Sequence, residues 1–150
     1  MGRDHYMTHK AGHFRTFIAL GACALLLGGC VSREQADAKM AKGCEAGVKA
    51  LLPEGRKIER VVETKFSTSP EGNDLRVVKM KAIENDGFLE IESNFECTFE
   101  EGFSFLNIGH AAAVHQLRIG DVIIGRSGDQ ILGDTSDFVK LTDAVTDAMH

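Results

Sequence analysis

The clearest pattern in the chain is an alternation of apolar and polar residues over positions 88–99, "FLEIESNFECTF". The apolar side carries Leu89, Ile91, Phe95, Cys97 and Phe99, and the polar side carries Glu90, Glu92, Asn94, Glu96 and Thr98. A period of two residues is typical of a β-strand, whose side chains point alternately to its two faces. The segment is therefore predicted to be a strand with one buried face, and Glu90, Glu92 and Glu96 are expected in water.

Three further segments predict strands in the same chain. Residues 57–66, "KIERVVETKF", place Ile58, Val62 and Phe66 on one side; residues 75–83, "LRVVKMKAI", and 114–125, "VHQLRIGDVIIG", are the other two. The first three strands are separated by "SPEGND" and "ENDG", which are turn sequences. The segment 100–113 is less regular and is not assigned to a strand.

Two segments have helical spacing. Ser32 and Gln35 fit a capping box, which predicts a helix that runs to about Leu52 and ends before Pro53. Asp134 or Ser136 can cap a second helix. The apolar positions on one face are Met40, Cys44, Val48, Leu51 and Leu52 in the first helix, and Phe138, Leu141, Val145 and Ala148 in the second.

Gly43 and Gly47 form a G-x-x-x-G pattern on the first predicted helix. Such a pattern would permit close approach of a neighbouring backbone. We interpret the two glycines instead as residues that weaken a short helix.

The order helix, four strands, helix predicts an α+β fold for residues 30–150, taken as a single domain. Consecutive strands joined by short turns form an antiparallel sheet. We expect a four-stranded antiparallel sheet covered on one face by the N-terminal and the C-terminal helix, with the other face in water.

The N-terminus has the layout of a secretory signal. Arg3, Lys10 and Arg15 precede an uncharged run from Thr16 to Val31. A transmembrane helix needs about 20 apolar residues, and this run is shorter and contains glycines. A buried core helix would need a polar face, which the run does not have. Met7 would give a leader of more typical length than Met1.

The end of this run, Leu27-Gly28-Gly29-Cys30, resembles the lipobox of bacterial lipoproteins. Ala22-Cys23-Ala24 fits an ordinary signal peptidase, but cleavage there would leave a core shorter than the roughly 7–15 residues required. The resemblance implies that residues 1–29 are a signal peptide and that Cys30 becomes the acylated first residue. It also implies a lipid-anchored protein of the cell envelope. In enterobacterial lipoproteins, an aspartate directly after the acylated cysteine signals retention in the inner membrane. Val31 occupies this position here, so the resemblance favours the outer membrane, with the domain facing the periplasm.

The lipoprotein interpretation leaves two cysteines, because Cys23 is removed with the signal and Cys30 carries lipid. Cys44 lies on the apolar face of the first predicted helix, and Cys97 lies on the apolar face of the strand 88–99. An exported chain meets an oxidising compartment. We therefore expect a Cys44–Cys97 disulfide that joins the helix to the sheet.

Charge and motifs narrow the function further. Residues 30–150 contain 14 Lys and Arg against 21 Asp and Glu, hence a net charge of −7, which argues against a nucleic-acid partner. No H-E-x-x-H, C-x-x-C, P-loop or G-x-S-x-G motif occurs. His110 and His115 are five residues apart, a spacing that suits neither one helix face nor one strand face. Glu100 and Glu101 are adjacent, so on a strand their side chains would point to opposite faces. Ser104 has no general base nearby in sequence. We predict no catalytic or metal site and no cofactor.

Residues 117–145 resemble the second half of a PDZ domain. The matching positions are Gly120, Asp121, Val122, Ile123, Gly128, Ile131, Asp137, Phe138 and Leu141. The upstream carboxylate-binding loop and the strand after the helix are missing, and Arg126 replaces an apolar residue. The resemblance implies that a peptide adds as a strand along residues 117–124. The groove would be lined by Leu117, Ile119, Val122, Ile124, Phe138 and Leu141.

Two function classes follow from the sequence. The first is a lipid-anchored envelope protein without catalysis, with a structural role or a role in contacts with another envelope protein. The second is a PDZ-like peptide-binding module on the envelope.

Overall fold

The computed structural model describes residues 30–72 and 74–150 of the chain. The predicted signal peptide, residues 1–29, lies outside the described residues. The helices and strands are α1 (Arg33–Leu51), β1 (Lys57–Thr68), β2 (Leu75–Asn85), β3 (Glu90–Phe103), the short 3-10 helix η1 (Phe105–Asn107), β4 (His110–Ile119), β5 (Val122–Ser127), β6 (Gln130–Leu132) and α2 (Thr135–Met149).

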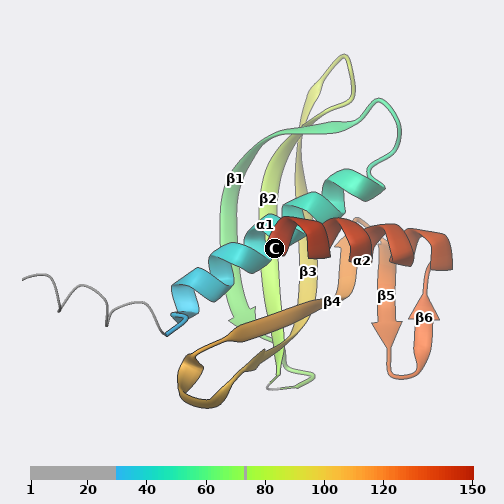
Figure 1. The fold of residues 1–150 in the computed structure, drawn as a ribbon. Helices are drawn as coiled ribbons and strands as arrows, with labels where there is room; N and C mark the ends of the chain where they lie inside the picture. The colour runs from blue at the N-terminus through green and yellow to red at the C-terminus, as the bar shows by residue number, and fades with distance from the viewer. Residues whose placement is uncertain (1–29, 73) are drawn as a thin grey trace, which may run out of the picture.

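The fold is α+β, as the sequence predicts. All neighbouring strands are antiparallel, and the order in the sheet follows the order in the chain, β1-β2-β3-β4-β5-β6. Both helices cross the same face of the sheet (Figure 1). α1 contacts β1 to β4, α2 contacts β4 to β6, and the two helices pack against each other.

The prediction of four strands is wrong, because the described sheet has six. Gly120 has a φ of +57°, a conformation that glycine adopts without steric cost, and it turns the chain between β4 and β5. The segment 114–125 is thus a hairpin and not one strand. Gly128, with a φ of +56°, allows a second turn into the short β6. β4 also begins earlier than expected, since His110 pairs with Phe103 at the end of β3.

The two faces of β3 agree with the predicted alternation from Phe95 onward, whereas Ile91, predicted on the buried side, is 38% exposed. Phe95, Cys97 and Phe99 are buried beneath the helices, and Glu90, Glu92 and Glu96 point to the opposite face. Leu89 is 66% exposed in spite of its apolar position. The connection between β2 and β3 extends past the helices, so nothing among the described residues covers it (Figure 1).

The helix caps follow local sequence. Ser32 accepts a hydrogen bond from the Gln35 backbone N–H, and the Gln35 side chain accepts one from the Ser32 N–H, which is the predicted capping box. α1 ends at Leu51, just before Pro53. Asp134, not Ser136, caps α2 and accepts a hydrogen bond from the Ser136 N–H.

Our interpretation of Gly43 and Gly47 as merely helix-weakening residues is wrong. Both are buried where α1 meets α2. A Cβ atom at Gly47 would lie 2.6 Å from Leu141 Cδ1, and one at Gly43 would lie 2.7 Å from Met149 Sδ. The missing side chains therefore let α2 approach α1 closely.

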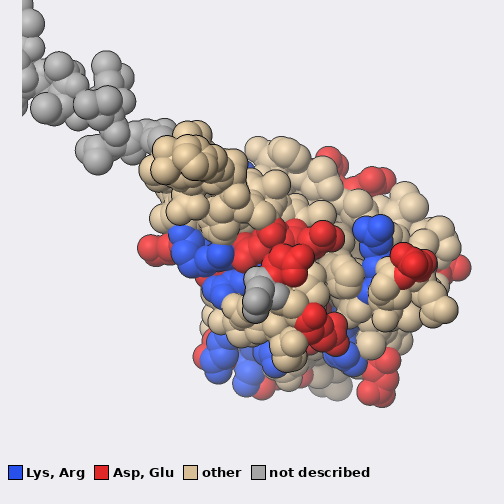
Figure 2. Space-filling view, turned by 90° about the horizontal axis from the view of Figure 1, so that it is seen from below, with Lys and Arg blue, Asp and Glu red and all other residues tan. Residues whose placement is uncertain are grey.

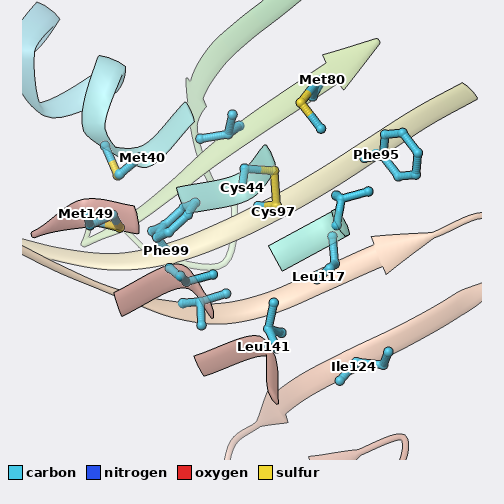
Figure 3. Packing of buried hydrophobic residues seen from close by; sticks show 14 of the residues in the cluster. Met40, Cys44, Met80, Phe95, Cys97, Phe99, Leu117, Ile124, Leu141 and Met149 are labelled. Carbon is cyan, nitrogen blue, oxygen red and sulfur yellow. A yellow bond between two sulfur atoms is a disulfide. The ribbon is translucent and has the colours of Figure 1, made fainter. Parts of the chain in front are cut away.

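One core joins the two layers. Figure 3 shows Met40 and Cys44 of α1 facing Cys97 and Phe99 of the sheet, with Leu141 and Met149 of α2 beside them. Both glycines lie on the α1 face that packs against α2, so the helix pair and the sheet share this core.

Candidate functional site

The predicted disulfide is present. Cys44 and Cys97 are bonded, with their Cα atoms 5.7 Å apart, and both are fully buried. On the sheet, Cys97 lies between Val78 of β2 and Leu117 of β4. The bond therefore fixes the middle of α1 to the centre of the sheet, as the two apolar faces predict.

Cys30 is the first described residue, and its side chain is exposed. Only Val31 separates it from Ser32, the N-cap of α1. The Val31 N–H donates a hydrogen bond of 2.7 Å to the Asn107 carbonyl, and Cys30 Sγ lies 3.6 Å from the Leu106 carbonyl oxygen. Cys30 is thus held beside the connection between β3 and β4.

This connection, residues 104–109, is named here the β3–β4 tip. Its sequence "SFLNIG" contains no charged residue. Phe105, Leu106 and Ile108 are 83%, 68% and 63% exposed. Figure 2 shows an uncharged projection at the end of the domain where the described residues begin.

A network of charged side chains lies behind the tip. Arg33 of α1 donates two hydrogen bonds to the Glu101 carboxylate, of 2.7 and 2.8 Å, and its guanidinium stacks 4.6 Å from the centre of the Phe103 ring. His110 Nε2 lies 2.9 Å from Oε2 of the same carboxylate, an oxygen that Arg33 also contacts. The Glu101 and His110 side chains are more than nine-tenths buried.

A second pair continues this network along α1. Arg76 of β2 donates hydrogen bonds of 3.0 and 2.6 Å to the buried Asp37. Together the two arginine–carboxylate pairs fix the first turns of α1 to the sheet. The Arg76–Asp37 pair is bidentate, with Nε and Nη2 each on one carboxylate oxygen, so it defines orientation as well as distance.

Sequence reasoning missed this network, although Glu101 has a signal. Counting by twos from Phe99 puts Glu101 on the buried face, where a carboxylate needs a partner. Its partner Arg33 is 68 residues away in sequence, and His110, nine residues away, lies on the next strand. The buried His110 Nδ1 has no hydrogen-bond partner among the described residues, and Ser104 Oγ is bonded to the Gly109 backbone.

The segment 117–124, predicted to border a peptide groove, is not one strand. Residues 116–119 pair with β3 on one side and with β5 on the other, so both of their edges are occupied. Residues 122–124 pair with β4 on one side, and β6 pairs only with residues 125–127 of β5. The turn at Gly120 thus folds the segment onto itself and leaves no free edge at residues 117–119.

The six residues proposed to line the groove have other places. Leu117, Ile124 and Leu141 are buried in the core, Ile119 and Phe138 pack against it, and Val122 is 57% exposed. The structure brings five of them to one core and leaves the sixth on the surface.

The uncovered face of the sheet carries charges of both signs. Lys79 pairs with Glu96 at 3.2 Å and Lys81 with Glu92 at 3.0 Å, across β2 and β3. The hydrogen bond that Lys81 donates to the Glu92 carboxylate raises the pKa of Lys81. These strands border a shallow hollow of about 580 Å³ that extends to Arg118 of β4.

Among residues 30–72 and 74–150, no helix is long and apolar enough to cross a membrane. In the same part of the chain, no group of three or more His, Cys, Asp or Glu side chains is placed to hold a metal ion.

A scan against protein-family models, a search of curated proteins and a search of solved structures each found no match to this chain.

Proposed function

We propose that this chain is a bacterial lipoprotein whose residues 30–150 are anchored to the cell envelope through acyl chains on Cys30. The anchored domain faces the periplasm, from the outer membrane, and has a structural or protein-contact role without catalysis. The observation that carries the proposal is the Leu27-Gly28-Gly29-Cys30 motif. Its last residue, Cys30, is exposed and lies at the start of the folded domain.

Two features of the folded domain support this proposal. The buried Cys44–Cys97 disulfide is typical of a chain that folds in an oxidising compartment. The position of Cys30 outside the core keeps its sulfur accessible to a modifying enzyme, and two or more acyl chains on one residue anchor a protein firmly.

The open sheet face is the surface we propose for contact with another envelope protein. Its alternating Lys and Glu side chains and its shallow hollow offer charge and shape for such a contact. We do not retain the PDZ-like alternative, since both edges of residues 117–119, where the added peptide strand would begin, are already paired.

Metabolic labelling with radioactive palmitate tests the anchor. The natural chain is expected to take up label, and a Cys30→Ser variant is expected to take up none. Cys23→Ser is the matched control, because it removes a neighbouring thiol but leaves the motif intact, so it should be labelled like the natural chain. Label in the Cys30→Ser variant, or no label in the natural chain, would refute the proposal.

Separation of inner and outer membranes on a density gradient tests the location. The labelled protein is expected in the outer-membrane fraction. Recovery of the labelled protein in the inner membrane would contradict this part of the proposal and leave the acylation itself unaffected.

A further inference from the structure

The β3–β4 tip presents three large apolar side chains to solvent within four residues. Isolated exposed apolar residues are ordinary on protein surfaces, but a contiguous group often marks a contact with another protein or a membrane. Phe105, Leu106 and Ile108 form such a group, and no charged residue interrupts it.

The backbone holds these side chains outward. Leu106 and Asn107 have φ values of 58° and 55°, a region that residues other than glycine seldom occupy. The Ser104 N–H donates to the Gly109 carbonyl at 3.0 Å, and the Gly109 N–H donates to Ser104 Oγ at 2.7 Å, which closes the base of the tip. Strained residues persist where the surrounding structure fixes them, and they concentrate at functional sites.

The tip also adjoins the proposed point of acylation. Cys30 Sγ contacts the Leu106 carbonyl oxygen, and the Val31 N–H is bonded to the Asn107 carbonyl. Acyl chains on this sulfur would start within a few atoms of Leu106. A bilayer that holds them must then lie against the tip.

A second exposed apolar group, at Phe88 and Leu89, gives a useful contrast. It lies at the other end of β3, in the connection between β2 and β3, and it is flanked by Asp86 and Glu90. Carboxylates oppose entry into a bilayer, whereas the β3–β4 tip has no such residue.

We propose that the β3–β4 tip inserts into the interfacial layer of the membrane that holds the acyl chains of Cys30. Phe105, Leu106 and Ile108 lie among the lipids there, and the charged pair of Arg33 and Glu101 lies just above them. This inference rests on the proposed acylation of Cys30. The acyl chains supply the attachment, and the tip fixes the orientation of the domain on the membrane.

A single reporter thiol tests the insertion in the full, acylated protein. With Cys44 and Cys97 bonded and Cys30 acylated, an Ile108→Cys substitution introduces the one thiol of the mature chain open to an environment-sensitive fluorophore. Phe105→Cys is a second reporter in the tip. Leu89→Cys is the matched control, because it replaces an equally exposed leucine at the far end of the same strand.

The labelled proteins are reconstituted into vesicles of phosphatidylethanolamine and phosphatidylglycerol, and detergent is then removed. Both tip reporters are expected to emit at shorter wavelength than in buffer and to be quenched by nitroxide-labelled lipids. The control at residue 89 is expected to show neither effect. Circular dichroism checks that each variant is folded, and the mass of each sample establishes whether Cys30 is acylated.

The outcomes separate the two proposals. Acylated protein whose tip reporters stay in water overturns the insertion but not the anchor. A mass that shows no acyl chain on Cys30 overturns the anchor; the reporters are then measured in a Cys30→Ser background, because the exposed Cys30 thiol would otherwise be labelled as well, and a response to vesicles there supports the insertion. If the mass shows no acyl chain on Cys30 and the tip reporters stay in water, both proposals are overturned. A concentration-dependent blue shift without vesicles would show that a second copy covers the tip, which also overturns the insertion.

Discussion

At the scale of single residues, the Cys44–Cys97 bond is the feature with the largest expected effect on stability. Its two ends are 53 residues apart in sequence. In the chain-entropy model, closing a loop of this length stabilises the folded state by about 4 kcal/mol. That is a large share of the roughly 5–15 kcal/mol that separates folded and unfolded states of a domain.

A Cys44→Ala/Cys97→Ala variant should therefore lower the free energy of unfolding by about 4 kcal/mol, measured by urea denaturation. Val122→Ala is the control, because it truncates a side chain that is 57% exposed and leaves both the bond and Cys30 in place, so its unfolding free energy should stay within about 0.5 kcal/mol of the natural value. A loss below about 1 kcal/mol in the double variant would mean that packing alone holds α1 on the sheet.

Asp134 gives a prediction for pH. Hydrogen bonds from the Ser136 side chain and then from its backbone N–H lower the pKa of Asp134 in the folded protein. The unfolded chain thus binds the proton more readily. The contribution of this residue to stability is present above its usual pKa of about 3.9 and is lost as the pH falls through the lower pKa of the folded state.

An Asp134→Asn variant retains a capping side chain without a titrating group. The difference in unfolding free energy between the natural chain and this variant should shrink as the pH falls from about 7 to about 3. Urea midpoints measured across this range test the prediction. Parallel curves for the two proteins would contradict it.

At the scale of elements, the contact between α1 and α2 depends on two glycines that differ in their surroundings. A methyl group at Gly43 meets mainly Met149, a flexible side chain at the end of α2, with Val145 slightly farther away at 3.1 Å. A methyl group at Gly47 meets the fully buried Leu141 and the β-branched Val145, which has few rotamers. Alanine also favours a helix over glycine by about 1 kcal/mol.

Gly47→Ala should lower the free energy of unfolding by about 1 kcal/mol, because overpacking of about 2 kcal/mol exceeds the gain in helix propensity. Gly43→Ala should leave it unchanged or raise it by up to about 1 kcal/mol. Each glycine variant is the control for the other, because both add one methyl group to the same face of α1, and urea denaturation measures both. Equal effects at both positions would mean that the helix contact does not distinguish them.

The sequence predicts elements well where local signals decide them. The capping box at Ser32, the stop before Pro53 and the alternation in β3 are all present in the structure. The hairpin of β4 and β5 was missed, because apolar residues flank Gly120 and Asp121 on both sides and make the run look continuous. β6, with three residues, is too short for any periodicity.

The end of β3 shows a different limit. Glu101 interrupts the apolar positions of the core face, so the alternation fades there although the strand continues to Phe103. Its partner Arg33 is 68 residues away in sequence, and no local pattern encodes that pairing.

At the scale of the whole molecule, the same limit governs the candidate site. The Leu27-Gly28-Gly29-Cys30 motif and the cysteine pair can be recognised from the sequence alone, because each depends only on the spacing of residues along the chain. The meeting of Cys30 with the β3–β4 tip depends on α1, β3 and β4 together, so it emerges only from the fold. For the same reason the residues predicted to line a groove, chosen from a 29-residue resemblance, became core residues once the hairpin formed.

The single residue between Cys30 and the cap of α1 sets the reach of the domain. A lipoprotein with a flexible tether of about 30 residues could search a radius of roughly 30 Å from its anchor. In the proposed lipoprotein no such tether would separate the acyl chains from α1, so the domain would extend from the bilayer only by its own length. β3 has 14 residues, so that height is about 45 Å. Under the proposed anchoring, any partner would have to come to the membrane surface, or be attached to the same leaflet, to meet this protein.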